Sequence, residues 1–436
     1  MKIKNKLLTA FLSLSLILPL YSVAQARHLI LRQIEESGNP AYRIPKRGIV
    51  EKRLDQKRHE SYSVNKNWFA PGQNIPEVSE GDTPVFALNE DNINRARRWP
   101  MVADDRGGTL LLSSSPEYVN RPGILYEDIV CGKARLVYYH VNDTELHCRM
   151  AVIVENFSES DRATISVTKG ALGISEDSYI EAAKRIQYNY INDTYEDKFE
   201  LKPGERTLLH RYMDQPILNP GQLAEGFFDF ESDEPVRISV VMLEEHAGTL
   251  DFMHIGRLQA PDQGKLRGSF PRMERYLTSR YTYYPETDGI IFFTIGDDRH
   301  DQFKTGYDAP DLSEAINYGN YGVNYHIKVD TKGYGRTHYY LRPLGGMYAG
   351  TVLITHGWKK KQEIISSPDN DLYFGVEGRM ELSDLGSYEN DSPVEILYTP
   401  PPGSNLPIQI ILVPEASYAY YRSQSEEELI RLTQND

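Results

Sequence analysis

The sequence predicts an all-β protein with two tandem β-sandwich-like domains, a short inserted helix and a flexible N-terminal lead. Short runs of β-branched and aromatic residues recur from residue 108 to residue 415, and clusters of turn-forming residues separate them. Three phrases of the first half also return, in the same order, in the second half. Together these observations favour one β fold repeated along the chain.

The first 26 residues have the three parts of a secretory signal peptide. A basic segment, MKIKNK, precedes the apolar run LLTAFLSLSLILPLYSV, and Ala24 and Ala26 complete an A-x-A cleavage site. We therefore expect a mature chain that begins at Arg27 and is periplasmic, secreted or held at the cell surface. The alternative is an uncleaved anchor, although this run is short for a bilayer and no later segment has the about 20 apolar residues of a spanning helix.

Residues 27–107 are expected to form an extended basic lead or linker. The segment YRIPKRGIVEKRLDQKRHE is charged, and PGQNIPEVSEGDTP is rich in turn formers. A short helix is expected near Asp91–Arg98. The basic run would suit an anionic envelope polymer, but a solvated linker is the simpler interpretation.

The first β-sandwich domain is expected at 108–250. Its predicted strands are GTLLLSS, GILYEDIV, ARLVYYHV, LHCRMAVIVEN, RATISVTK, KFELKPGERTLLH, AEGFFDFES and VRISVVML. The segment 175–191 interrupts them, because Tyr179, Ala183, Ile186 and Tyr190 recur at helical spacing. This segment predicts an inserted helix capped by Ser175.

The second β-sandwich domain is expected at 265–415. Its predicted strands are GIIFFTIG, YGVNYHIKVD, THYYLRP, AGTVLITHG, VEILYT and PIQIILVP. A short helical tail is expected at 416–436, where Ser425 and Glu428 have the spacing of a capping box.

The two domains are related by three echoed phrases. YHVNDT at 139–144 returns as YHIKVDT at 325–331, TISVTKG at 164–170 returns as TVLITHG at 351–357, and SDEPVRISVV at 232–241 returns as SNLPIQIILV at 404–413. A tandem repeat explains their common order. The alternative is similar strand chemistry in two unrelated sandwiches.

The stretch YYHVNDTELHC, at 138–148, predicts a hairpin that turns at Asn142-Asp143. In that register three side chains that can bind a divalent metal share one face. They are His140, Glu145 and His147. The echo at 325–331 keeps its histidine, His326, without a partner for His147, so an ordinary hairpin is the simpler interpretation.

Cys131 and Cys148, the two cysteines of the chain, invite a disulfide in an oxidising compartment. The hairpin register places Cys148 opposite Val137, roughly 20 Å from Cys131 at ~3.3 Å per residue. Bonded cysteines need Cα atoms within about 7 Å. A bridge therefore requires the chain to fold back or break at Gly132.

Two further groups are candidate binding residues. Asp297, Asp298 and Asp301 lie together in GDDRHDQF and would suit Ca²⁺, although a solvated turn is the simpler interpretation. Tyrosines, 30 in the chain, can stack on sugars or dock a protein from an exposed sheet face, but are also ordinary strand residues. The candidates are Tyr281, Tyr283, Tyr284, Tyr318, Tyr321 and Tyr325.

Composition and the lack of several known motifs argue against some classes of function. A formal net charge of -14 argues against nucleic-acid binding. The chain has no G-x-S-x-G, H-E-x-x-H, P-loop or G-x-G-x-x-G motif. The leading hypothesis is a non-enzymatic surface or envelope protein that binds carbohydrate or a protein partner. The alternatives are an extracellular hydrolase that uses Asp297, Asp298 or Asp301, and an assembly subunit whose N-terminal lead adds a strand to a neighbour.

Several phrases together resemble a known family. RPGILYEDIV, ARLVYYHVN, LKPGER, RGSFPR, NYGNYGVNYHIKV, LGGMYAG and PPPGSNLPI are similar to the C-terminal region of secreted bacterial copper amine oxidase N-terminal-like domain proteins. The resemblance spans roughly residues 108–415, and its most specific pieces are GNYGV and PPPGSNLP. The stalk domain of that family, with its GR…VPLR-like motif, is absent. The resemblance implies an extracellular, surface-associated β protein and transfers no catalytic residue.

Overall fold

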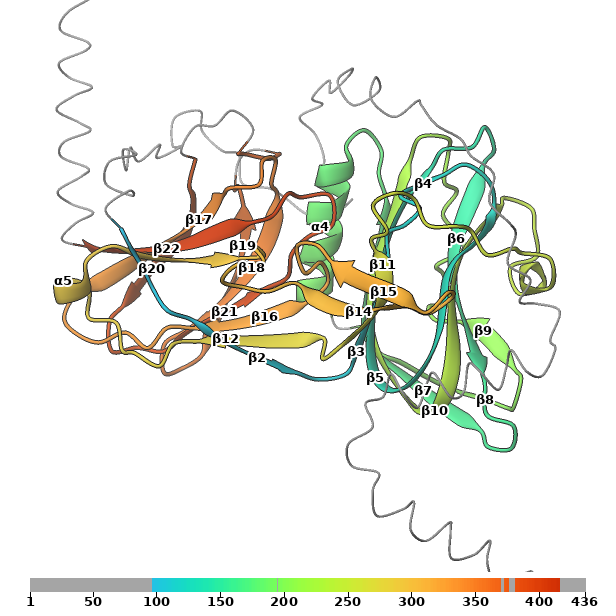
Figure 1. Cartoon of the computed structure of the whole chain (residues 1–436), viewed down its shortest axis with the longest axis horizontal. Coiled ribbons are helices and arrows are strands. Elements are labelled where there is room, and N and C mark those ends of the chain that lie inside the picture. Colours follow the sequence, from blue (N-terminus) through green and yellow to red (C-terminus); the bar gives the residue numbers. More distant parts are fainter. Residues whose placement is uncertain (1–95, 194, 370–371, 376–380, 416–436) are drawn as a thin grey trace, which may run out of the picture. The chain divides into compact units, whose positions relative to one another are not determined.

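The computed structural model describes residues 96–193, 195–369, 372–375 and 381–415, which form three β-sheets and one longer helix, α4, Tyr179–Asn192 (Figure 1). The all-β class is therefore confirmed, and the other helical elements among these residues are the short α5 (Pro285–Asp288) and a 3-10 turn at Asp251–His254. The expected signal peptide, most of the N-terminal lead and the expected helical tail lie outside the described residues.

An eleven-stranded sheet is organised by two strands of unusual length, β5 and β10. Along its main path the strands are β15 (Ser313–Asn317), β14 (Lys304–Asp308), β11 (Arg267–Pro271), β3 (Thr109–Ser113), β5 (Gly123–Asn142), β10 (Leu223–Glu244), β6 (Cys148–Asn156) and β9 (Arg206–Leu208). Three further strands complete it: β4 (Tyr118–Val119) pairs with β5, and β7 (Ala163–Ile174) pairs with β10 and with β8 (Asp197–Leu201). Each long strand unites two predicted strands, because the pairing continues past an irregularity between Ser232 and Val236.

The other two sheets face each other across a shared apolar core. The six-stranded sheet has the order β19 (Lys361–Ser367), β18 (Gly350–His356), β21 (Val394–Tyr398), β16 (Asn324–Lys328), β12 (Glu274–Thr278) and β2 (Val102–Arg106). The five-stranded sheet has the order β1 (Arg97–Arg98), β13 (Ile291–Ile295), β22 (Ile408–Pro414), β17 (Arg336–Pro343) and β20 (Ser383–Glu389). Ile327 and Ile354 of the first pack with Leu341 and Ile410 of the second, which is a β-sandwich arrangement.

The strand pairing crosses the positions at which the sequence was expected to divide. Strands β1 and β2, from the expected lead, pair with β13 and β12. Strand β11, from the expected second domain, pairs with β3 of the first. All described residues also belong to one compact unit, Val64–Asp436. The short helix expected near Asp91–Arg98 is wrong where the structure describes it, because 97–98 are a strand.

The echoed phrases do not occupy equivalent positions. Strands β5 and β10, which carry the first and third phrases of the first half, pair with each other. Their counterparts β16 and β22 lie in different sheets. The echoes therefore reflect similar strand chemistry in two different arrangements.

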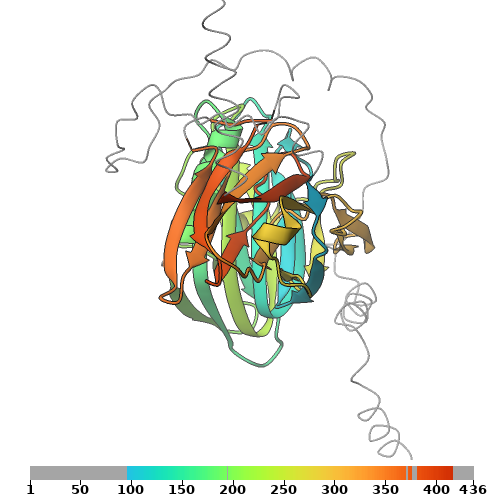
Figure 2. The same cartoon turned by 90° about the vertical axis from the view of Figure 1, so that its left-hand side faces the viewer.

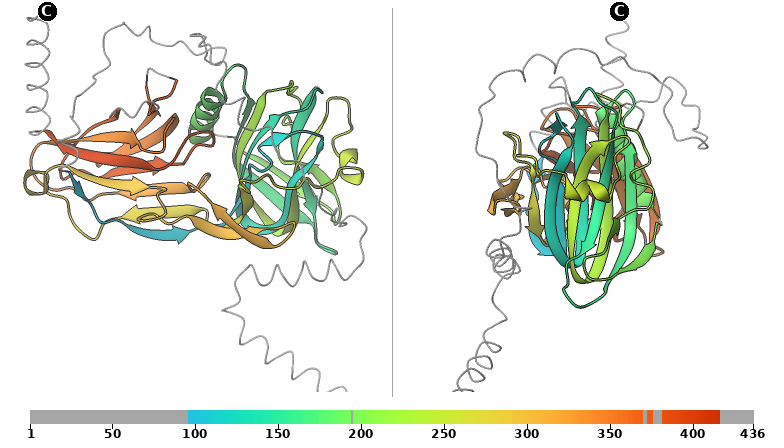
Figure 3. Two further views of the ribbon diagram at one scale, coloured as in Figure 1. Left: turned by 45° about the horizontal axis from the view of Figure 1, so that its top comes forward. Right: turned by 90° about the vertical axis from the view of Figure 1, so that its right-hand side faces the viewer.

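The predicted inserted helix is present as α4, with a different cap. Ser178 Oγ accepts a hydrogen bond from the amide of Glu181 (3.4 Å), whereas Ser175 Oγ accepts from the amide of Leu223 (2.8 Å). One side of α4 contacts β7 and β10, and the other contacts β18 and β19 (Figure 3). The helix thus fills the space between the eleven-stranded sheet and the six-stranded sheet.

Candidate functional site

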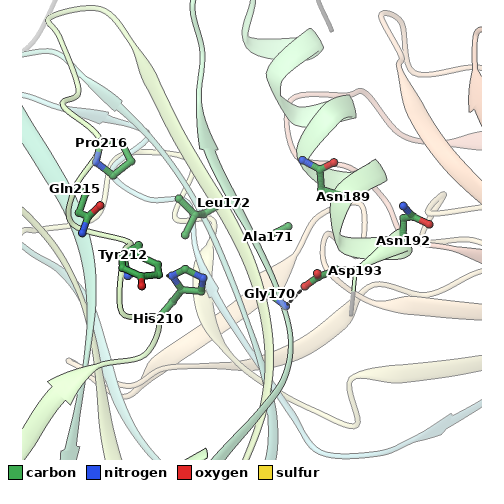
Figure 4. Close-up of a pocket in the computed structure, with 10 residues that line it drawn as sticks. All are labelled: Gly170, Ala171, Leu172, Asn189, Asn192, Asp193, His210, Tyr212, Gln215 and Pro216. Atoms are coloured by element: carbon green, nitrogen blue, oxygen red, sulfur yellow. Dashed lines mark hydrogen bonds between the residues drawn. The ribbon is translucent and has the colours of Figure 1, made fainter. Parts of the chain in front are cut away.

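A surface pocket of about 600 Å³ lies beside the C-terminal end of α4 (Figure 4). Asn189, Asn192 and Asp193 line it on the helix side, and residues 170–172 of β7 form its floor. His210, Tyr212, Gln215 and Pro216, from the segment that follows β9, line the opposite side. The pocket therefore joins three parts of the chain that are separated in sequence.

The helix side presents two amides and one fixed carboxylate. Asn189 and Asn192 are exposed in the last turn of α4. Asp193 Oδ2 accepts from the amide of Gly170 (3.0 Å), and its Oδ1 accepts from the amide of Tyr195 (2.9 Å). Asp193 Oδ2 thus holds the helix end against the floor, Oδ1 fixes the chain that follows the helix, and the two asparagine amides remain available to a ligand.

The floor of the pocket requires glycine at position 170. A Cβ atom at Gly170 would lie 2.9 Å from a ring carbon of Phe228 and 3.3 Å from a ring carbon of Tyr195. A larger residue would displace these rings. Glycine at position 170 thus allows β7 to lie close to Phe228 at the floor of the pocket.

The opposite side is an aromatic group centred on His210. The amide of Tyr212 donates to His210 Nδ1 (3.2 Å), so the neutral ring carries its proton on Nε2. The ring of His210 lies 4.4 Å from that of Tyr195 and 6.1 Å from that of Tyr212, measured between centroids. Burial lowers the pKa of His210, which favours this neutral form. Tyr212 is 55% exposed.

The backbone of the aromatic side is anchored to β6. The amide of Leu209 donates to the carbonyl of Val152 (2.9 Å), and the amide of Val152 lies 3.1 Å from Met213 Sδ. Met213 is buried. Tyr212 and Gln215 therefore project from a fixed segment, and ligand binding would order little additional backbone.

The pocket combines planar hydrogen-bonding groups with an exposed aromatic face. An amide both donates and accepts, the His210 Nε2–H donates, and the phenol of Tyr212 does either. Among the residues that line the pocket, Asp193 is the one carboxylate.

The predicted hairpin at 138–148 is wrong, and its histidines are separated. Strand β10 lies between β5 and β6, so these strands do not pair with each other. His140 is buried and bonded to Ser113 Oγ and the Pro116 carbonyl, whereas His147 and Glu145 are exposed. His147 Nδ1 lies 2.8 Å from Asn219 Oδ1. Across the described residues, no three His, Cys, Asp or Glu side chains are placed to hold a metal ion.

Ser113 and His140 have the geometry of a nucleophile and its base, without access to solvent. His140 Nδ1 lies 2.8 Å from the Pro116 carbonyl oxygen, which can only accept, so Nδ1 carries the proton. His140 Nε2 therefore accepts from the Ser113 hydroxyl at 2.8 Å. Both side chains are fully buried, and burial lowers the pKa of His140 to about 4. The pair is a structural contact, because a substrate cannot reach Ser113 Oγ.

The aspartates of GDDRHDQF stabilise a turn and a buried ion pair. Asp297 Oδ1 accepts from the amides of His300 (2.8 Å) and Asp301 (3.0 Å). Asp301 is 2% exposed and bonds Arg275 Nη1 (2.5 Å) and Tyr325 Oη (2.6 Å). Asp298, which is exposed, has a positive φ of 56° and accepts from the amide of Phe303. The oxygens of Asp301 thus already have strong donors.

The six predicted binding tyrosines do not share one exposed face. Tyr283 and Tyr325 are fully buried, so they offer no surface to a ligand. Tyr321 is half-buried and donates to the Ser404 carbonyl (2.7 Å). The exposed fractions of the other three are 62% for Tyr281, 49% for Tyr284 and 54% for Tyr318.

Cys131 and Cys148 are not joined by a disulfide. Cys131 is exposed beside the irregularity of β10, with its Sγ 3.8 Å from the Ser232 carbonyl. Cys148 is buried at the start of β6, opposite Glu244 of β10. Strand β10 therefore separates the two thiols.

Sequence reasoning missed every residue that lines the pocket. The available signal was HRYMDQP, at 210–216, a polar and aromatic segment that follows a strand and carries no apolar alternation. Only the fold shows that this segment faces the end of α4.

The chain was compared with protein families, curated proteins and solved structures. No protein-family model and no curated protein matches it. Three of the solved structures that it resembles show only weak likeness. Vicilin from Solanum lycopersicum (tomato) is 10% identical with a TM-score of 0.10, over 70% of this chain and 85% of that chain. The 7S globulin of Momordica charantia is 8% identical with a TM-score of 0.11, over 66% and 78%. Vicilin from Capsicum annuum is 11% identical with a TM-score of 0.10, over 64% and 74%. Scores this low carry no argument about fold or function.

Proposed function

We propose that the chain is an exported, envelope-associated binding protein that holds a carbohydrate in the pocket beside α4. The observation that carries this proposal is the pairing of exposed Tyr212 with the amides of Asn189 and Asn192 around one pocket. A sugar ring has an apolar C–H face and a rim of hydroxyls. Tyr212 suits the face, and the amides suit the hydroxyls.

Two further features support binding over catalysis. The single carboxylate that lines the pocket, Asp193, is occupied by two backbone amides. His210 accepts a backbone hydrogen bond on Nδ1, so its remaining Nε2–H serves as a donor rather than a base.

The signal-peptide-like start of the sequence supports an exported protein that meets envelope polysaccharides. In the described part of the chain, no helix is long and apolar enough to cross a membrane.

The proposal is tested by retention on insoluble polysaccharides. The chain from Arg27 onward is passed over peptidoglycan and over neutral glucans, and bound protein is eluted with soluble fragments of the same polymer. We expect retention on at least one polymer and its loss in the Tyr212→Ala variant. Tyr318→Ala is the matched control, because Tyr318 is 54% exposed and Tyr212 is 55% exposed. Absence of retention on every polymer, or equal retention of the Tyr212→Ala variant, would overturn the proposal.

A further inference from the structure

One end of the β-sandwich carries the most exposed aromatic side chains of the described residues. The three most exposed are Tyr334 at 91%, Trp358 at 81% and Tyr281 at 62%, and Tyr284, 49% exposed, lies close to Tyr281 in sequence. They lie on three connections, 279–284 after β12, 329–335 before β17 and 357–360 between β18 and β19. We call this set the aromatic end. It lies at the same end as helix α5, which faces the viewer in Figure 2.

Backbone hydrogen bonds join these connections to one another. Tyr283 donates to the carbonyl of Asp330 (2.8 Å), and Lys332 donates to the carbonyl of Tyr283 (2.9 Å). The turn between β20 and β21 continues the chain of contacts. Its amides and carbonyls form three bonds: Asn390 N to Gly335 O (3.0 Å), Asp391 N to Thr331 O (3.1 Å) and Gly357 N to Pro393 O (2.9 Å). The exposed rings are therefore presented by a connected set of turns.

The turn between β18 and β19 adds positive charge beside Trp358. Gly357 and Lys360 have positive φ angles of 75° and 53°, which makes the turn tight and leaves Trp358 and Lys359 at its tip. Neither Lys359 nor Lys360 forms a side-chain hydrogen bond or ion pair with another described residue. The next lysine, Lys361, pairs with Glu363 at 2.5 Å.

Two acidic side chains in these turns pair with neighbouring lysines. Asp330 pairs with Lys328 (2.9 Å), and Asp391 lies 3.7 Å from Lys332. The ammonium groups of Lys359 and Lys360 thus remain as an uncompensated positive tip on a chain whose formal net charge is -14. Such an asymmetry orients a molecule in the field of an anionic surface.

We propose that the aromatic end docks on the surface of an anionic lipid bilayer. Tryptophan and tyrosine favour the headgroup region, where an apolar ring and a polar tip are both accommodated. Each lysine near an anionic leaflet contributes about 1 kcal/mol of attraction. Trp358 and Tyr334 enter the headgroup region, and Lys359 and Lys360 meet lipid phosphates.

The exposure of the rings favours a bilayer over a sugar or a protein groove. Tyr334 and Trp358 stand on convex turns at 91% and 81% exposure, with little protein beside them to complete a pocket. Carbohydrate recognition needs hydrogen-bonding side chains around the ring, as at Tyr212. A protruding ring next to ammonium groups suits a soft, negatively charged interface. This inference is independent of the proposed carbohydrate pocket, because the two surfaces share no residue.

Flotation with lipid vesicles tests the inference. The chain from Arg27 onward is mixed with vesicles of equal parts phosphatidylcholine and phosphatidylglycerol, and in a second arm with phosphatidylcholine alone. We expect flotation with the anionic vesicles, and at least about tenfold weaker partition for the Lys359→Ala/Lys360→Ala variant. Trp358→Ala should weaken partition comparably while folding normally, because its side chain is exposed.

Tyr318→Ala is the matched control, since it removes a ring that is 54% exposed and lies outside both the aromatic end and the pocket. It should float like the wild-type chain. Equal flotation of the wild-type chain and the lysine and Trp358→Ala variants would overturn the inference, as would an absence of flotation. Retention on an acidic polysaccharide that these variants abolish, without vesicle binding, would assign the aromatic end to a different partner and also overturn it.

Discussion

Arg135 on β5 and Asp229 on β10 form a bidentate ion pair across the two longest strands. Arg135 Nε lies 2.7 Å from Asp229 Oδ1, and Nη2 lies 2.9 Å from Oδ2. Nη2 also bonds Glu274 Oε1 of β12 at 2.6 Å, and Tyr190 of α4 donates to Asp229 (3.0 Å). Arg135 is 1% exposed. One buried guanidinium thus connects the eleven-stranded sheet, the helix and the six-stranded sheet.

Loss of Asp229 should therefore destabilise the whole described unit. Asp229→Ala removes one of the two carboxylates that balance the buried charge of Arg135. We therefore expect the free energy of unfolding to fall by about 3–5 kcal/mol. Urea denaturation measures this change. Glu200→Ala is the control, because Glu200 lies in an exposed pair with Arg162 at 4.0 Å, and its loss should cost less than about 1 kcal/mol. Similar losses in both variants would contradict the structural role of the buried pair.

The buried imidazole of His140 should make the protein acid-sensitive. Burial lowers its pKa from 6.5 to about 4. Between these two pH values the imidazole is protonated in the unfolded chain and neutral in the folded protein. The free energy of unfolding should fall as the pH falls from 6.5 to about 4, by about 3 kcal/mol at about 1.4 kcal/mol per pH unit. His140→Gln should be less stable near pH 7 but lose correspondingly less stability on acidification. If the free energy of unfolding of the wild-type chain and of His140→Gln changed with pH in parallel, His140 would not be the source of the acid sensitivity.

Glu225 should destabilise the protein with the opposite pH dependence. It is fully buried on β10, and neither carboxyl oxygen has a hydrogen-bond partner among the described residues. Burial raises its pKa well above the ordinary value, although the nearby Arg185 opposes the shift. Stability should therefore be lost as the pH rises above 4.5, the ordinary value for the unfolded chain. Glu225→Met should raise the free energy of unfolding at pH 7 by at least about 1 kcal/mol, with a smaller gain near pH 4.5. A variant less stable at pH 7 would contradict this expectation.

The two cysteines should differ in reactivity in the native protein. Cys131 is exposed, whereas Cys148 is fully buried and burial raises the pKa of its thiol. A thiol reagent should label Cys131 before unfolding and Cys148 only afterwards, and mass spectrometry of peptides distinguishes them. Cys131→Ser should abolish native labelling. Detection of no thiol before reduction would show a disulfide and contradict the strand order.

Local pattern was sufficient for the fold class and for most strand positions, but not for strand order. The run from 134 to 141 and the run from 148 to 156 are both strands, as the residue types predict. Their pairing as a hairpin failed because β10, about eighty residues later, inserts between them. Asn142, expected in the turn, instead donates from Nδ2 to the carbonyls of Leu218 and Leu146 (2.9 and 2.8 Å). Pairing with the long strand β10 buries more apolar surface than the predicted local turn would, and it therefore determines the strand order.

The strands that sequence reasoning overlooked are short or exposed. In β2 four of five residues are exposed; β14 contains lysine and glycine, and β15 contains asparagine. Such segments lack the alternation that identifies a strand. The pocket was missed for a related reason: Asn189 belongs to α4, and Tyr212 lies in a segment beyond the predicted strand that ends at His210. Their meeting depends on how α4 packs against β7.

The most direct test of the proposed function is the dissociation constant of a soluble saccharide for the wild-type chain and its pocket variants, measured by isothermal titration calorimetry. The saccharide is the fragment that elutes the chain from its polymer. Tyr212→Ala and Asn192→Ala should each weaken binding about tenfold or more, a cost of about 1.4 kcal/mol. Lys359→Ala/Lys360→Ala should bind like the wild-type chain. Equal constants for the wild-type chain and both pocket variants would contradict carbohydrate binding beside α4.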